Sequence, residues 1–179
     1  DETLKEVTTG EIVDYGVSGA FALTNIRWFP SGDRLAIMGR VQNDLQFFKF
    51  PGMPLQQKSE MNLDYGTQAL AAKWHPSGNY LAVGGSGAVN GKEAQVYKFD
   101  ANHTLSSLAG GGIDYGTSVN ALSWSADGSL LAVGGLGSTL ENEVQVYRFN
   151  NQSSLCLTTS AGYGGGVYAL AWSKDSNYL

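Results

Sequence analysis

Three aspartates at equivalent places are the first candidates for acid–base chemistry. Asp14, Asp64 and Asp114 stand fifty residues apart, and each directly precedes a Tyr-Gly pair. General acid–base catalysis needs groups within reach of one proton, but no histidine or second acid accompanies each aspartate, and repetition spreads the three apart. We interpret them as turn-forming or edge-capping residues.

Serine and histidine are the next candidates, because they form the nucleophile and base of many hydrolases. Neither His75 nor His103 has a Gly-x-Ser-x-Gly context. His75 stands at a hairpin turn, where other copies have Phe29, Ser125 and Ser173, so we expect a structural or exposed side chain. The missing histidine–acid–nucleophile set predicts no catalytic residue and a protein that is not an enzyme.

Two glycine-rich stretches and one thiol complete the chemical inventory. Gly84-Gly85-Ser86-Gly87 and Gly134-Gly135-Leu136-Gly137 lack the Walker lysine and open no helix, so we predict no phosphate site. The chain has one cysteine, Cys156, and two histidines. These three residues do not have the spacing of zinc ligands. We expect a buried thiol in a strand, and neither a cofactor nor a metal.

The elements that hold these residues are copies of one unit. Asp64 to Phe99 aligns without a gap to Asp114 to Phe149, a looser copy runs from Asp14 to Phe50, and a fourth begins at Tyr163 and stops at Leu179. A period of about 50 residues is typical of solenoids and propellers.

Each copy has the pattern of four short strands. For the third copy we expect a strand, a tight turn, an apolar strand, a glycine-opened loop, an aromatic strand and a polar outer strand. These are Val119 to Trp124, Ala126 to Gly128, Leu130 to Val133, Gly134 to Glu143, Gln145 to Phe149 and Ser154 to Thr159. No window has helical periodicity between caps.

The repeats predict an all-β fold, a β-propeller of four-stranded antiparallel blades, with about 3.5 blades in this chain. The predicted units are an outer strand of a preceding blade at 1–13, three blades at 14–62, 63–112 and 113–161, and a truncated blade at 162–179.

Two blocks resemble WD40 repeats. Trp74-His75-Pro76-Ser77-Gly78 with Leu81-Ala82-Val83-Gly84-Gly85, and Trp124-Ser125-Ala126-Asp127-Gly128 with Leu131-Ala132-Val133-Gly134-Gly135, are similar to the family's strand, turn and Leu-Ala-small-Gly strand. Tyr-Gly replaces the usual Gly-His, and Tyr-Lys-Phe or Tyr-Arg-Phe replaces Trp-Asp. The family's His–Asp–Ser–Trp network is therefore not expected here.

Ring closure is a separate question, because propellers use about 4–8 blades and the resemblance implies about seven. We expect either an excerpt of a larger ring or a part-ring completed by a second copy, and we favour the excerpt because an edge that cuts a strand exposes unpaired backbone.

The recurring tyrosines have two interpretations. Tyr15, Tyr65, Tyr115 and Tyr163 either line one face and contact a partner, or pack between blades with each hydroxyl capping a loop; we favour the second. The variable loops Arg40 to Asn43, Ser86 to Glu93 and Leu136 to Glu143 are better binding candidates. Their charged residues are Lys92, Glu93, Glu141 and Glu143.

Charge limits the partner. The net charge of -5, without clustered Lys and Arg, argues against nucleic acid and anionic membranes, and no apolar run is long enough to insert into one. We predict a scaffold that binds protein or peptide through its loop face; the alternative is a carbohydrate-binding propeller with repeated sites. The sequence does not determine the compartment, although it favours the cytoplasm. It also does not determine whether the glycosylation sequons at Asn102 and Asn151 are used.

Overall fold

The computed structural model describes residues 24–39, 45–49, 56–57, 63–88, 90–100, 104–150 and 154–179. Within these ranges the chain forms strands β1 to β12 and no helix, which confirms the predicted all-β class. No helix in the described ranges is long and apolar enough to cross a membrane. Predictions for Asp14, Tyr15, Asn102, His103, Asn151 and the loop 40–43 concern residues outside them.

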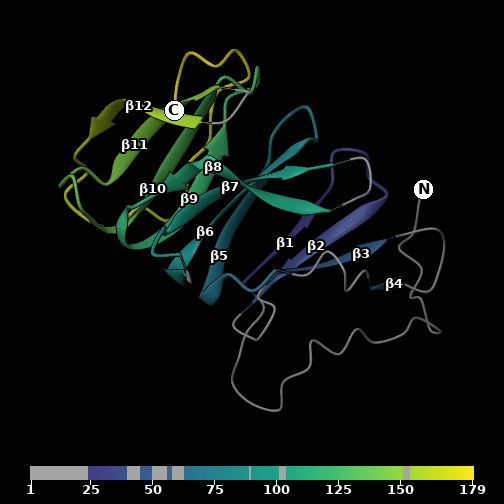
Figure 1. The fold of residues 1–179 in the computed structure, drawn as a ribbon. Coiled ribbons are helices and arrows are strands. Elements are labelled where there is room, and N and C mark those ends of the chain that lie inside the picture. The colour runs from purple at the N-terminus through teal and green to yellow at the C-terminus, as the bar shows by residue number, and fades with distance from the viewer. Residues whose placement is uncertain are drawn as a thin grey trace, which may run out of the picture.

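The strands form consecutive antiparallel groups of four (Figure 1). The first group comprises β1 (Asn25–Trp28), β2 (Arg34–Met38), β3 (Leu45–Lys49) and β4 (Gln56–Gln57). The second comprises β5 (Gly66–Trp74), β6 (Tyr80–Ala88), β7 (Ala94–Phe99) and β8 (Leu105–Ile113). The third comprises β9 (Gly116–Trp124), β10 (Leu130–Ser138), β11 (Val144–Asn150) and β12 (Ser154–Ala161).

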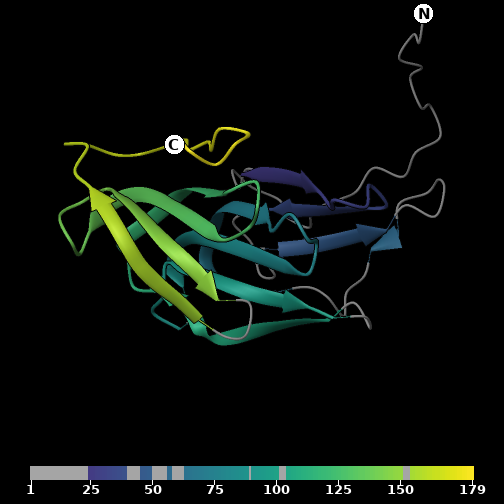
Figure 2. The same ribbon diagram turned by 90° about the horizontal axis from the view of Figure 1, so that it is seen from above.

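Each group begins with the strand that contacts its neighbours. β1 and β9 both contact β5, and β6 also contacts β9 (Figures 1 and 2). The outer strands β8 and β12 meet through one parallel bridge between Gly110 and Ser154, which joins the second and third groups into an eight-stranded sheet. This is the arrangement of a partial propeller; the unit boundaries stay a prediction.

The second strand of each full group is longer than the sequence indicates. β6 and β10 continue through the glycines that were expected to open a loop, and a register shift occurs between Gly134 and Gly135. The reason is close packing between groups: a Cβ on Gly134 would lie 2.5 Å from Val167 Cγ1. These glycines therefore let neighbouring groups approach closely.

Residues 162–179 contain turns but no strand, although a strand leading to Trp172 was expected. The segment still follows the repeat: Val167 N donates to the Gly135 carbonyl at 3.0 Å, and Trp172 Nε1 donates to the Ser123 carbonyl at 3.0 Å. Trp124 Nε1 makes the equivalent bond to the Lys73 carbonyl at 3.1 Å. Trp124 and Trp172 therefore each tie their segment to the first strand of the preceding repeat, whereas the buried Trp74 Nε1 has no partner among the described residues.

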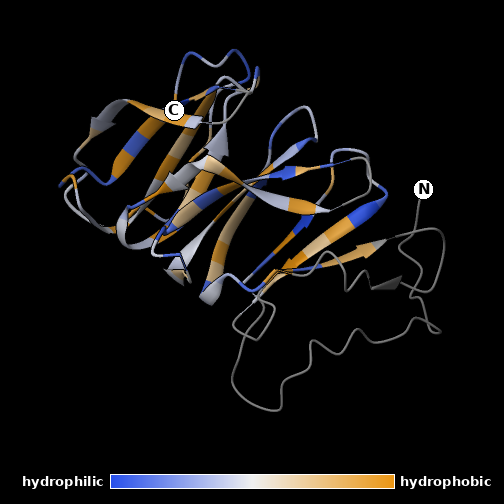
Figure 3. Ribbon diagram, in the orientation of Figure 1, coloured by the Kyte–Doolittle hydropathy of each residue, from blue (hydrophilic) through white to orange (hydrophobic). Residues whose placement is uncertain are grey.

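The core lies along the strands and between the groups. Hydrophobic residues concentrate on the strands and hydrophilic ones on the turns (Figure 3). The largest side chains that are fully buried are Tyr115, Phe47, Met38, Leu45, Leu81, Leu122 and Leu131. Burial of apolar surface stabilises such a core by about 25 cal/mol for each Å² removed from water.

Cys156 corrects one prediction. It lies in a strand, as expected, but its side chain is exposed and not buried. β12 is the outer strand of its group, and its side chains from Cys156 to Thr159 are exposed as a run. The expectation failed because a small hydrophobe at the outer edge has no layer to cover it.

Candidate functional site

The tyrosines of the Tyr-Gly pairs are structural in the two full repeats. Tyr65 and Tyr115 are buried, and their hydroxyls donate to the carbonyls of Glu93 at 2.5 Å and Glu143 at 2.7 Å. Burial raises the pKa of the Tyr115 hydroxyl, so it remains a donor at neutral pH. Each tyrosine thus fixes the end of the loop in its own repeat, as the favoured interpretation proposed.

The glutamates then connect each repeat to the next one. Glu93 Oε2 accepts from Tyr115 N at 2.9 Å and Gly116 N at 3.1 Å. Glu143 Oε2 accepts from Tyr163 N at 2.6 Å and Gly164 N at 3.2 Å. We call this alternation of hydroxyl-to-carbonyl and amide-to-carboxylate bonds the Tyr–Glu relay.

The residues of the relay differ in their exposure to solvent. Glu93, Tyr65 and Tyr115 are buried, and their hydrogen bonds hold the loops. Tyr163 is 75% exposed. Hydrogen bonds from the Tyr163 and Gly164 amides lower the pKa of Glu143, which keeps its carboxylate ionised.

Two further candidates lie on the loops themselves. Glu141 is exposed and has a left-handed backbone, with φ of 56°. Lys92 forms an ion pair with Asp114 at 3.7 Å, which links the β6–β7 loop to the aspartate before the next Tyr-Gly. An exposed pair contributes little to stability. A role of any of these residues in partner binding stays a prediction.

The Tyr–Glu relay leaves a signal in the sequence that the predictions above do not use. Glu93 and Glu143 each precede the strand glutamine of their repeat by two residues. Their place at the end of a variable loop favours partner contact when each loop is considered alone. Their equivalent position in successive repeats indicates an architectural role instead.

A hollow of about 440 Å³, which we call the central hollow, is formed by residues of successive repeats. Its lining residues are Thr24, Gln68, Leu70, Ser118, Asn120, Leu136 and Tyr168. Gln68 and Leu70 lie on β5, Ser118 and Asn120 on β9 and Leu136 on β10, whereas Thr24 and Tyr168 lie outside the strands. The lining therefore combines several repeats, so no single sequence window could predict the site. Leu136 is 36% exposed and Tyr168 is 71% exposed, so apolar and aromatic surface lies among hydroxyls and amides.

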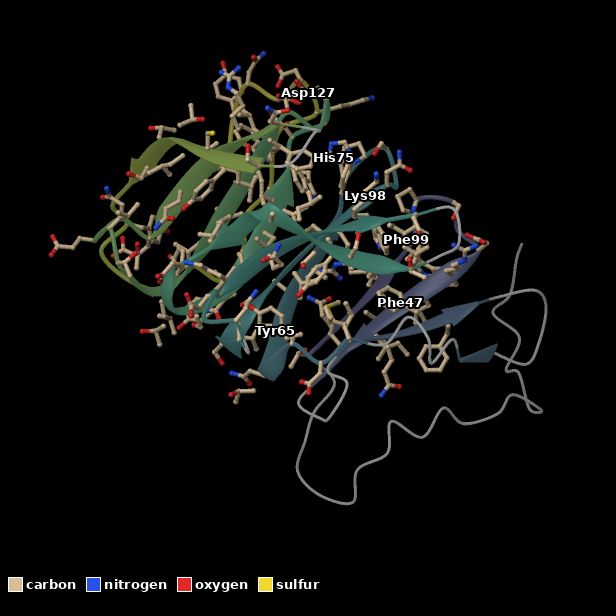
Figure 4. All side chains as sticks on the ribbon, in the orientation of Figure 1. Phe47, Tyr65, His75, Lys98, Phe99 and Asp127 are labelled. Atoms are coloured by element: carbon tan, nitrogen blue, oxygen red, sulfur yellow. The ribbon has the colours of Figure 1, made fainter. Side chains whose placement is uncertain are left out.

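His75 lies at the opposite end of the sheets from Tyr65, next to the turn that holds Asp127 (Figure 4). Its ring is buried and lies 5.0 Å from the Trp124 ring, centre to centre. Nδ1 accepts from Ser77 N at 3.1 Å, so the proton is on Nε2, which lies 3.1 Å from the Gly128 carbonyl. The histidine is therefore structural and joins two hairpins.

Burial lowers the pKa of His75, with the Gly128 carbonyl and the Asp127 charge acting in the opposite direction. Protonation of Nδ1 would also set an N–H against the Ser77 N–H. The folded state therefore favours the neutral ring, and the stability from this preference is complete above the unfolded pKa near 6.5.

We expect the free energy of unfolding to fall as pH drops below about 6.5, by at most about 1.4 kcal/mol per pH unit from this group. His75→Phe is the matched control, because Phe29 fills this place in the first repeat and packs against Trp74. Denaturant unfolding between pH 8 and 5 measures the slope. An equal slope in both proteins would contradict the assignment. Asp127, whose pKa its serine hydrogen bonds lower to about 2, titrates below this window.

Comparison with known proteins agrees with this architecture. Residues 103–141 match the model of the WD domain, G-beta repeat. The chain therefore carries a WD40 repeat and has a propeller fold. No curated protein matches the sequence.

Solved structures with the same fold differ in function. The Cps50 (Swd1) β-propeller domain of Myceliophteria thermophila has a TM-score of 0.56 at 13% identity, over 86% of this chain and 48% of that one. A chain of the mitotic checkpoint complex has a TM-score of 0.61 at 18% identity, over 86% and 44%. The periplasmic gluconolactonase of Pseudomonas aeruginosa has a TM-score of 0.63 at 16% identity, over 79% and 40%.

These likenesses show the fold and set two limits. The chain spans less than half the length of these structures. The prediction that the protein is not an enzyme is corrected, because structures described as gluconolactonases share its fold. The prediction failed because it rested on residues that lie near one another in the sequence. A propeller can assemble a site from residues of several repeats.

Proposed function

We propose that the chain is a protein-interaction scaffold that binds a peptide segment of its partner in the central hollow. The WD40-type fold supports the interaction role in general. The observation that carries the specific proposal is the hollow itself, which brings Gln68, Asn120 and Tyr168 of three repeats together.

The hollow has the polar groups that a peptide backbone needs. Gln68 Nε2 donates to Ser86 Oγ at 2.9 Å, and Asn120 Oδ1 accepts from Ser118 Oγ at 3.2 Å. Among the described residues, Gln68 Oε1 and Asn120 Nδ2 have no further partner. One acceptor and one donor are what an extended peptide unit requires.

Tyr168 and Leu136 supply an apolar contact for the peptide. Tyr168 and Leu136 both line the hollow and are exposed, and tyrosine is enriched among residues that dominate binding energy. Because most of the lining stands on the strands β5, β9 and β10, little conformational entropy is lost when the partner docks.

The carbohydrate-binding alternative needs equivalent exposed aromatic sites in each repeat. Tyr65 and Tyr115 are buried, and Tyr163 alone of the described three is exposed. The central hollow also takes different residues from each repeat. A single shared site therefore favours the scaffold.

Random peptides displayed on phage, selected against the intact chain, test this proposal. We expect a selected peptide to bind Asn120→Ala and Tyr168→Ala at least about tenfold more weakly than the original protein. Tyr178→Ala is the matched control, since Tyr178 is 73% exposed but lies outside the hollow lining. Enriched peptides that bind all four proteins equally, or no enrichment at all, would overturn the proposal.

A further inference from the structure

We infer that a second site, a cationic cavity formed by the first strands, binds a small oxyanion of the phosphate or carboxylate class. This inner cavity has a volume of about 160 Å³ and shares Asn120 and Tyr168 with the central hollow. The two cations in its lining are Arg27 of β1 and Lys73 of β5.

The two cations lie close together without a carboxylate in the described lining. Burial, and then the charge of Arg27, lower the pKa of Lys73. Like charges at short range raise the energy of the folded protein, and a bound anion would remove that repulsion. The site is local, since the chain as a whole carries a net charge of -5.

Arg27 also has unused hydrogen-bonding capacity. One terminal nitrogen of its guanidinium donates to the Ile26 carbonyl at 2.8 Å. Its Nε is buried and has no partner among the described residues. An unsatisfied buried donor destabilises the folded protein, and a planar guanidinium is well suited to an oxyanion.

The fold does not require cations at these positions. Arg27 and Lys73 occupy the place that Ser123 fills in the third repeat and Ala171 in the fourth. Ser123 accepts the indole bond of the following repeat as Lys73 does, through the backbone carbonyl. Because only two of the four repeats have a positive side chain at this position, we infer that the two cations serve a ligand site and not the architecture of the repeat.

Neutral donors complete the lining. Asn25 and Asn120 lie on either side of the β5 segment that carries Ala71 and Ala72, and all four line the inner cavity. The small alanines leave the space open, and the amides can donate to an anion that the two cations attract. The volume suits a small oxyanion and excludes a large ligand.

Isothermal calorimetry with inorganic phosphate and with succinate, at constant ionic strength, tests the inference. We expect saturable binding of at least one of them, and a dissociation constant at least about tenfold weaker in Lys73→Ser and in Arg27→Gln. Lys98→Ser is the control, because Lys98 is exposed on β7 and lies outside the cavity lining.

The outcomes separate cleanly. Binding of phosphate alone, or of succinate alone, identifies the oxyanion class, and binding of both shows a general site. Lys73→Ser, which copies the residue of the third repeat, should also unfold at the same or a higher temperature without anion, because the repulsion is gone. Absence of binding, or equal binding by the control and both cavity variants, would overturn the inference.

Discussion

Glu93→Ala is expected to lower the free energy of unfolding by about 2–4 kcal/mol. The Glu93 carboxylate is buried and accepts two backbone amides, from Tyr115 and Gly116. Without it, both donors lose their partner beside the fully buried Tyr115 ring. Denaturant unfolding at neutral pH measures the loss.

Two variants make this experiment specific. Glu141→Ala removes the same side chain from an exposed loop position, and its effect should stay within about 0.5 kcal/mol. Glu93→Gln keeps one acceptor oxygen and should fall between the original protein and Glu93→Ala. Equal stability of Glu93→Ala and Glu141→Ala would show that the relay contributes nothing.

Gly84→Ala is the second large effect, with an expected destabilisation of about 1–3 kcal/mol. The new Cβ would lie 2.5 Å from Val119 Cγ1 and 3.3 Å from Leu122 Cδ1, across the boundary between the second and third groups. Both side chains are buried and cannot turn toward solvent. Thermal or denaturant unfolding measures the change.

The cause of that loss can be isolated. Gly165→Ala is the matched control, because its Cβ would meet nothing within 4 Å. Val119→Ala frees the space that the Gly84→Ala methyl needs, so the double variant should lose less stability than the two single losses added together. Strict additivity would show that contact with Val119 is not the reason.

Much of the fold could be predicted from the repeats. The Trp spacing and the Pro-Ser-Gly or Ala-Asp-Gly turns place the first hairpin of each group correctly, since β5 ends at Trp74 and β9 at Trp124. The lengths of β6 and β10 were underestimated, because glycine in a strand normally indicates a break. Here it indicates a close approach by Val119 or Val167 of the following repeat.

The site was less predictable, for a physical reason. Sequence periodicity identifies positions that every repeat shares, and these proved to be the relay, whose members are mostly buried. Binding surfaces arise where repeats differ, as at Gln68, Asn120 and Tyr168, and only the fold brings these positions together.

Backbone amide hydrogen exchange at Tyr115 and Gly116 tests the central claim, that the Tyr–Glu relay ties each repeat to the next. Both amides donate to Glu93 and lie outside the β10–β11 ladder, so that ladder serves as an internal reference. The relay predicts protection at both amides in the original protein and faster exchange in Glu93→Ala, with a larger increase at these two amides than in the ladder. Exchange of both amides at the rate of an unstructured peptide in the original protein would contradict the relay.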